Sequence, residues 1–120
     1  MAINILVVDD EPDIRLLYRS ELEDHGFKVL EASGSEECFD HLEKSKVDLV
    51  LLDIKLKGES GIDILQSISG KEKKAKVILA TAYSAYQDDF STWLADGYWV
   101  KTQEIETLTE EINKVLGKTK

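Results

Sequence analysis

The chain has 120 residues, of which 42% are hydrophobic; this fits one domain with one core and excludes a disordered chain. Its formal net charge of −9 disfavours contact with nucleic acid or anionic membranes, and we expect neither as a partner. Cys38 is the only cysteine, no signal sequence begins the chain, and no apolar run approaches the roughly 20 residues that span a bilayer, so we expect a cytoplasmic protein.

Apolar runs alternate with segments of helical periodicity along the chain. Strands are predicted at residues 3–8, 27–31, 47–52, 76–80 and 97–100. Helices are predicted between and after them, at residues 12–25, 33–45, 61–69, 85–95 and 102–116. The first strand run shows no polar alternation, which is typical of strands buried on both faces.

Several residues mark where the predicted helices begin and end. Pro12 suits the first turn of a helix, because its missing N–H has no partner there. Gly26 and Gly117 follow the last periodic positions of two helices and are predicted to terminate them. Ser33 with Glu36 has the spacing of a capping box for the second helix.

Five successive strand–helix units predict an α/β fold with helices on both faces of a parallel sheet. Right-handed crossovers favour a flavodoxin-like, doubly wound sheet with strand order 2-1-3-4-5 and five helices. We expect residues 1–120 to form a single domain. The topological switch point then lies between the first and third strands, which end in Asp9-Asp10 and Asp53.

Three carboxylates gathered at one sheet edge repel one another. Two charges roughly 5 Å apart repel by about 3 kcal/mol at an effective dielectric of about 20. Magnesium is the natural ion to offset this, since it prefers one or two carboxylates together with water and phosphate oxygens. The sequence therefore predicts an Mg²⁺ site at Asp9, Asp10 and Asp53.

Two further strand ends complete the constellation. Thr81 ends the fourth predicted strand and Lys101 follows the fifth. The chemistry that this set suggests is phosphoryl transfer to a carboxylate. Asp53 would be the nucleophile, Lys101 would neutralise a phosphoryl oxygen, and the Thr81 hydroxyl would bind another.

The motifs at these strand ends also occur together in a known family. They are Asp9-Asp10, Asp53, Thr81-Ala82 and Tyr98-Trp99-Val100-Lys101, with the segment 51–61 and its final glycine. On these motifs the whole chain resembles the CheY-like receiver domains of response regulators, which act in two-component and phosphorelay signalling.

The resemblance implies a role for each motif residue. Asp53 would accept a phosphoryl group from a histidine kinase or a phosphotransfer protein. Asp10 and Asp53 would bind Mg²⁺ directly, with the Lys55 backbone carbonyl as a third ligand. Thr81 and Tyr98 would form the switch pair. Output would pass to a downstream effector protein through the fourth helix, fifth strand and last helix. The chain would be a monomer or weak dimer, and no enzyme beyond its own phosphorylation and dephosphorylation.

The sequence departs from the family pattern at two places. Thr102 follows Lys101 where the family usually has proline, so we predict a trans peptide bond or an altered loop there. Lys57 stands where proline usually follows the phosphoacceptor by four residues. Lys55 and Tyr83 flank the path of water in such domains, and a bulky Tyr83 predicts a long-lived phosphoryl group.

Three alternatives remain open from the sequence. A haloacid-dehalogenase-like phosphatase would need Asp-x-Asp after the first strand, where this chain has Asp9-Asp10-Glu11. A flavodoxin would need a phosphate loop that acidic residues would repel. A phosphorylation-independent adaptor could share the receiver fold. Trp93 and Trp99 fit either the core or a partner surface, whereas Cys38 fits the core.

Overall fold

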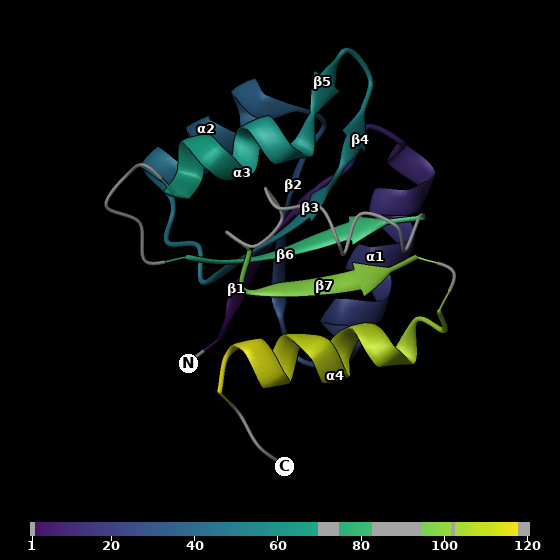
Figure 1. Ribbon diagram of the computed structural model, residues 1–120. Coiled ribbons are helices and arrows are strands. Elements are labelled where there is room, and N and C mark those ends of the chain that lie inside the picture. The colour runs from purple at the N-terminus through teal and green to yellow at the C-terminus, as the bar shows by residue number, and fades with distance from the viewer. Residues whose placement is uncertain (1, 70–74, 83–94, 102, 118–120) are drawn as a thin grey trace.

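The computed structural model describes residues 2–69, 75–82, 95–101 and 103–117, and Figure 1 shows the arrangement of its elements. The strands are β1 (Asn4–Val8), β2 (Lys28–Ala32), β3 (Leu49–Asp53), β4 (Lys55–Leu56), β5 (Glu59–Ser60), β6 (Lys76–Thr81) and β7 (Gly97–Val100). The described helices are α1 (Pro12–Asp24), α2 (Ser35–Lys44), α3 (Gly61–Ser69) and α4 (Glu106–Val115).

Five strands form a single parallel sheet in the order β2-β1-β3-β6-β7. Numbered by the five large strands alone, this is the predicted order 2-1-3-4-5, so the predicted topology is confirmed. The central strands β1 and β3 pair along their length, from Ile5 opposite Leu49 to Val8 opposite Leu52. Their carboxyl ends therefore lie side by side, which places the residues that follow them together.

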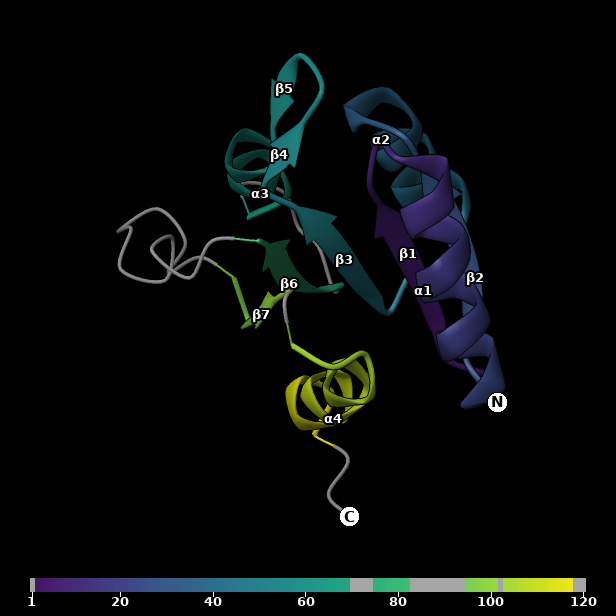
Figure 2. The same ribbon diagram turned by 90° about the vertical axis from the view of Figure 1, so that its right-hand side faces the viewer.

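The two faces of the sheet bury two separate cores (Figure 2). One core packs α2 and α3 against side chains such as Val50, Leu52 and Leu79. The other packs α1 and α4 against side chains such as Leu51 and Ile78. Neighbouring residues of β3 thus face opposite cores, which explains why its run is apolar without alternation. The chain after β1 leads to α1 on one face and the chain after β3 leads to α3 on the other, so the topological switch point of the sheet lies between these two strands.

The signals at helix ends are confirmed in part. Pro12 occupies the first turn of α1, and Gly26 and Gly117 follow their helices with φ of 89° and 79°, where glycine is favoured. The Ser33–Glu36 capping box is wrong. Gly34 is the N-cap residue of α2, and Ser33 donates instead to Glu37 Oε1 through its N–H at 2.6 Å and its hydroxyl at 2.9 Å.

The last helix begins at Glu106, four residues later than the predicted Thr102. The Thr107 hydroxyl donates to the Glu104 carbonyl at 2.6 Å, and Trp99 Nε1–H donates to Thr107 Oγ1 at 2.9 Å. These contacts tie the start of α4 to β7. The predicted helix at residues 85–95 and the Lys101–Thr102 peptide bond lie outside the described residues. So do the proposed shield Tyr83 and Trp93.

The short antiparallel pair β4–β5 was not predicted. It forms a hairpin between β3 and α3, with Lys57 and Gly58 at its turn. Gly58 has φ of 75°, the left-handed conformation that tight turns commonly place on glycine. None of the helices that the structure describes has the length and apolar character required to cross a membrane.

Candidate functional site

Three aspartates meet at the carboxyl ends of β1 and β3. Asp9 and Asp10 directly follow β1, and Asp53 is the last residue of β3. One carboxylate oxygen from each lies within 4.8 Å of the others. Asp9 is 1% exposed and Asp53 is 7% exposed, so two of these acids are almost removed from water. The predicted acidic cluster is therefore present.

Lys101 enters this cluster from the end of β7. Its ammonium lies 2.9 Å from Asp9 Oδ2 and 3.0 Å from Asp53 Oδ2. Its own N–H donates to the Thr81 carbonyl at 2.7 Å, which fixes the backbone of Lys101 beside β6. One cation thus bridges two buried carboxylates, and it offsets part of the repulsion that the sequence predicts.

Burial and charge act in opposite directions on these groups. Burial raises the pKa of the Asp53 carboxyl, whereas the charge and hydrogen bond of Lys101 lower it. Burial lowers the pKa of Lys101. The hydrogen bond to Asp9 and the charge of Asp53 raise this pKa by more than burial lowers it, so the pKa of Lys101 lies above its ordinary value. Lys101 is therefore charged at neutral pH.

Backbone N–H groups hold each carboxylate in place. Asp9 Oδ1 accepts from the Glu11 N–H at 3.0 Å, and Asp53 Oδ1 accepts from the Lys55 N–H at 3.3 Å. Asp10 Oδ2 accepts from the Lys57 N–H at 2.7 Å. Each carboxylate has lone pairs to spare beyond these bonds. An all-oxygen donor set of three acids suits Mg²⁺, so the residues present fit that ion.

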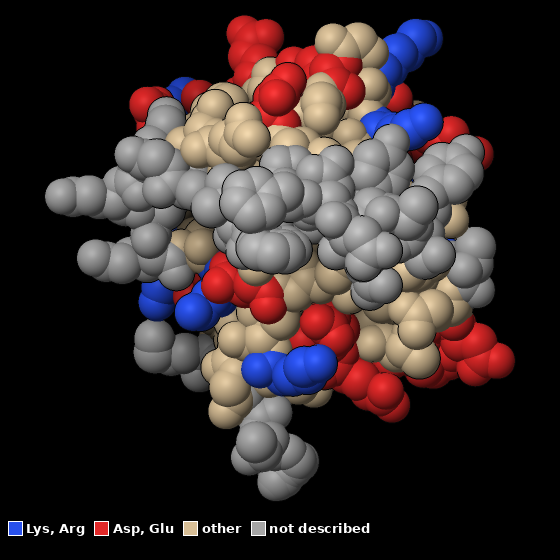
Figure 3. All heavy atoms as spheres, viewed as in Figure 1, with Lys and Arg blue, Asp and Glu red and all other residues tan. Residues whose placement is uncertain are grey.

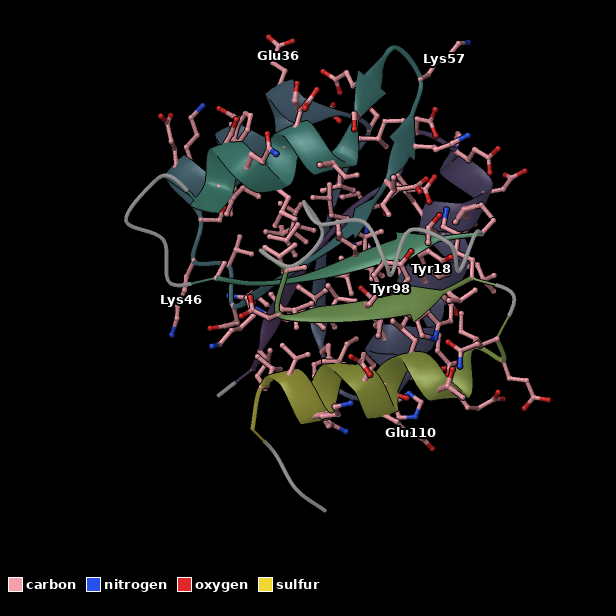
Figure 4. The ribbon with its side chains drawn as sticks, viewed as in Figure 1. Tyr18, Glu36, Lys46, Lys57, Tyr98 and Glu110 are labelled. Atoms are coloured by element: carbon pink, nitrogen blue, oxygen red, sulfur yellow. The ribbon has the colours of Figure 1, made fainter. Side chains whose placement is uncertain are left out.

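Thr81 and Tyr98 lie on neighbouring strands. Thr81 is the last residue of β6 and is 2% exposed. It pairs with Val100, while Leu79 pairs with Tyr98, so both side chains face the same side of the sheet. Tyr98 is half-buried against the core beneath α2 and α3, and Figure 4 shows its position on β7. The two residues that the resemblance pairs thus share one face.

Two residues of α1 that were not predicted as site residues also reach this region. Arg15 Nη1 donates to the Asp9 carbonyl at 2.6 Å, and its Nε lies 3.1 Å from Glu31 Oε1. Burial raises the pKa of Tyr18 to about 12, with the charges of Lys101, Asp9 and Asp53 also acting on its hydroxyl.

Trp99 belongs to the core rather than to a partner surface. It is 3% exposed, and its ring meets that of Tyr18 edge-on with 5.8 Å between centroids. Cys38 is 0% exposed, which confirms its predicted place in the core.

Gly61 lies in close contact with the backbone of Asp53 and Ile54. A Cβ at this position would lie 2.0 Å from the Asp53 carbonyl oxygen, and the Gly61 N–H donates to the Ile54 carbonyl at 2.7 Å. The start of α3 therefore packs directly on the backbone that presents Asp53. Only glycine fits this close approach.

The family of the chain follows from its sequence as well as from this site. The family model described as the response regulator receiver domain matches residues 5–113. The chain belongs to this family. The assignment decides against the phosphatase and flavodoxin alternatives, and it makes the chain a signalling module of two-component systems rather than an enzyme in its own right.

Solved structures agree with this assignment. The receiver is similar to the response regulator TrrA from Thermotoga maritima, solved in complex with Mg(2+)-BeF, with 43% identity and a TM-score of 0.88 over 94% of this chain and 98% of TrrA. TrrA in complex with the histidine kinase ThkA matches with 44% identity and a TM-score of 0.87, over 95% of this chain and 98% of that one.

Curated relatives are similar over most of the receiver. The sensory transduction protein LytR of Staphylococcus epidermidis is 37% identical over 112 residues, which are 92% of this chain and 44% of LytR. The sporulation initiation phosphotransferase F of Bacillus subtilis is 37% identical over 79 residues, 66% of this chain and 64% of that protein. The chain spans less than half the length of its LytR relatives.

Proposed function

We propose that residues 1–120 act as one receiver domain that accepts a phosphoryl group on Asp53 from a histidine kinase or a phosphotransfer protein. The observation that carries this proposal is the Lys101 ammonium, which lies 2.9 Å from Asp9 and 3.0 Å from Asp53 inside the acidic cluster. A buried carboxylate beside a fixed cation is positioned to attack an electrophile that brings negative oxygens with it. The TrrA complexes with Mg(2+)-BeF and with a histidine kinase support this choice of ion and donor.

The transfer exchanges one bond to phosphorus for another. A carboxylate oxygen of Asp53 forms the new O–P bond while the P–N bond to the donor imidazole breaks, and the imidazole nitrogen takes up a proton. Lys101 then has a new anionic neighbour, because the phosphoryl group adds about −1.5 to −2 charges beside its ammonium. In this step the chain supplies position and charge, which are most of what phosphoryl transfer requires.

Asp9, Asp10 and Asp53, with the backbone carbonyl of Lys55, are the residues that would hold Mg²⁺. When bound, the ion would neutralise negative charge on the transferring phosphoryl oxygens. The Glu11 and Lys57 N–H groups orient Asp9 and Asp10 for this task. We expect Asp10, the least buried acid of the three, to be in contact with water as well.

Thr81 and Tyr98 would pass the change to a downstream effector protein. A phosphoryl oxygen on Asp53 can attract the Thr81 hydroxyl, and Tyr98 can then turn toward the vacated space on the same face. A groove of about 570 Å³ lies beside Tyr98, between β7 and α4, lined also by Trp99, Thr107 and Glu111. A few kcal/mol of differential interaction is enough to shift such a two-state balance.

The charge of the surface bears on the partners. Figure 3 shows acidic side chains gathered over α2 and α3 at the top of the view and again over α4. With a formal net charge of −9, such a surface repels phosphate backbones and anionic lipid. We therefore propose protein partners, with neither nucleic acid nor membrane contacted directly, and a monomer or weak dimer.

The decisive experiment is incubation with acetyl phosphate and Mg²⁺ followed by intact-mass measurement. Wild type should gain the mass of one phosphoryl group, and Asp53→Asn should gain none. Asp63→Asn is the matched control, because Asp63 is an exposed aspartate in the first turn of α3. Equal labelling of wild type and Asp53→Asn would refute the proposal. No labelling of wild type would favour a phosphorylation-independent adaptor.

A further inference from the structure

The β4–β5 hairpin holds two of the three site carboxylates through its backbone. At the turn, the Lys57 N–H donates to Asp10 Oδ2 at 2.7 Å. At the start of β4, the Lys55 N–H donates to Asp53 Oδ1 at 3.3 Å. The hairpin stands out beyond the carboxyl end of β3 (Figures 1 and 2), so its position decides where these two N–H groups point.

The far side of the same hairpin is attached to α2. Glu59 Oε1 accepts from the Ser35 N–H at 2.9 Å, and Glu59 Oε2 accepts a short hydrogen bond from the Ser35 hydroxyl. Gly34 passes so close that a Cβ there would lie 2.9 Å from Glu59 Oε1. We call this paired contact the Glu59–Ser35 clasp.

The hairpin is fixed in part by Leu56, whose side chain packs into the core beneath α2 and α3, but its own backbone pairing is short. Its strands are two residues long and pair only Lys55 with Ser60 and Leu56 with Glu59. Such a short pair is not stable by itself in water. The Glu59 carboxylate, by contrast, meets an otherwise unpaired N–H in the first turn of α2, where the helix dipole also favours a negative charge. The clasp therefore anchors the far side of the hairpin to α2.

We propose that Glu59 and Ser35 are positioning residues of the metal site. The clasp holds the hairpin so that the Lys57 N–H orients the Asp10 carboxylate toward the other two acids, and it thereby sets the affinity for Mg²⁺. This inference rests on the proposed function, in which Asp10 is a magnesium ligand. The Lys57 N–H occupies one lone pair of Oδ2, and the carboxylate keeps others for a cation. Outer contacts that orient a ligand are known to change metal affinity.

The test measures two quantities on the full chain. The first is the hydrogen-exchange rate of the Lys57 amide in a chelator, and the second is the dissociation constant for Mg²⁺ by calorimetric titration. In Glu59→Ala, we expect the Lys57 amide to exchange about fivefold faster and Mg²⁺ to bind about fivefold more weakly. The amide of Leu42, inside α2, should exchange as in wild type. If Glu59 had a purely structural role, its removal would not speed exchange of the Lys57 amide selectively, and it would leave the dissociation constant for Mg²⁺ unchanged.

Matched variants separate the effect of losing the clasp from the effect of changing the net charge. Glu36→Ala removes the same charge from the first turn of α2, where Figure 4 shows Glu36 pointing away from the molecule, and it should leave both quantities unchanged. Ser35→Ala changes no charge and should weaken Mg²⁺ binding in the same direction as Glu59→Ala. Ser35→Thr, which keeps a hydroxyl, should restore it. Since Ser35→Ala removes only one hydroxyl, it keeps the test available if Glu59→Ala does not fold.

The outcomes distinguish this inference from the proposed function. A wild type that does not bind Mg²⁺ would overturn the proposed function and this inference with it. A wild type that binds Mg²⁺, with Glu59→Ala and Ser35→Ala binding it equally well or more tightly, would overturn the clasp alone.

Discussion

Lys101 supplies the positive charge that lies between two buried carboxylates of the site. Its ammonium lies within 3.0 Å of Asp9 and Asp53, both nearly buried. In Lys101→Met the two carboxylates face each other without a cation, so we expect the free energy of unfolding in a chelator to fall by about 2 kcal/mol. Mg²⁺ should restore more stability to the variant than it adds to wild type, because the ion no longer competes with the ammonium. Urea unfolding with and without Mg²⁺ measures both effects.

Lys44→Met is the control for this prediction. Lys44 forms an exposed pair with Asp40 at 3.0 Å on α2, and such pairs contribute little. We expect its unfolding curve to match that of wild type in both buffers. If Lys101→Met also matched wild type in the chelator, Lys101 would not be what offsets the repulsion between the two acids.

Tyr18 gives the folded state a dependence on alkaline pH. Burial raises its pKa to about 12, above the value of about 10 in an unfolded chain. The stabilisation is therefore complete below about pH 10 and is lost as the pH rises toward the folded pKa. Near pH 11 wild type should lose about 1 kcal/mol of unfolding free energy that Tyr18→Phe does not lose. Parallel losses in the two proteins, measured by urea unfolding, would contradict this.

At the scale of elements, the junction of β3, the hairpin and α3 leaves no room for a side chain at Gly61. In Gly61→Ala the new Cβ would lie 2.0 Å from the Asp53 carbonyl oxygen, so backbone must move. Overpacking of this kind typically costs 1–3 kcal/mol, and we expect about 2 kcal/mol together with a slower phosphorylation of Asp53. Thermal unfolding and acetyl phosphate labelling measure the two effects.

Gln66→Ala serves as the reference for that substitution. Gln66 is exposed on the same helix, and alanine has the higher helix propensity. Its stability and labelling should stay close to those of wild type. A Gly61→Ala protein as stable as Gln66→Ala would mean that α3 can move away from β3 without loss.

Elements whose signals are local were predictable from the sequence, whereas those set by distant partners were not. The runs of β1 and β3 predicted two buried strands, and their shared edge predicted the meeting of Asp9, Asp10 and Asp53. The capping box failed because α2 takes its N-terminal partner from the hairpin, through Glu59, which is 24 residues away from Ser35. Spacing along a helix carries no signal for such a contact.

The sequence does contain a signal for the hairpin. Lys57-Gly58 sits between two short runs, and glycine at such a turn is typical of tight connections. The start of α4 had no comparable signal, because the contacts of Thr107 with Trp99 and Glu104 determine that the helix begins at Glu106. The bridging position of Lys101 likewise depends on its bond to the Thr81 backbone, which only the folded sheet provides.

At the scale of the whole molecule, the site and the two cores are one cooperative unit. The acids follow strands that are buried on both faces, so a ligand that binds the site stabilises the same strands that organise the cores. Any group deep in a core should therefore respond to Mg²⁺, although it lies away from the acids.

Cys38 is the group that can report this coupling. It is 0% exposed on the buried face of α2, so an aromatic disulfide reagent reaches it only when the core opens. Burial also raises the pKa of its thiol to about 11, which keeps it unreactive in the folded protein. At Mg²⁺ about ten times the dissociation constant, the added stability is about 1.4 kcal/mol and labelling should slow about tenfold. Asp10→Asn should abolish the slowing, with sodium chloride of equal ionic strength as the salt control. If the labelling rate of Cys38 did not change with Mg²⁺, the reagent would reach Cys38 through a local opening of α2. The stability of this core would then be independent of the site.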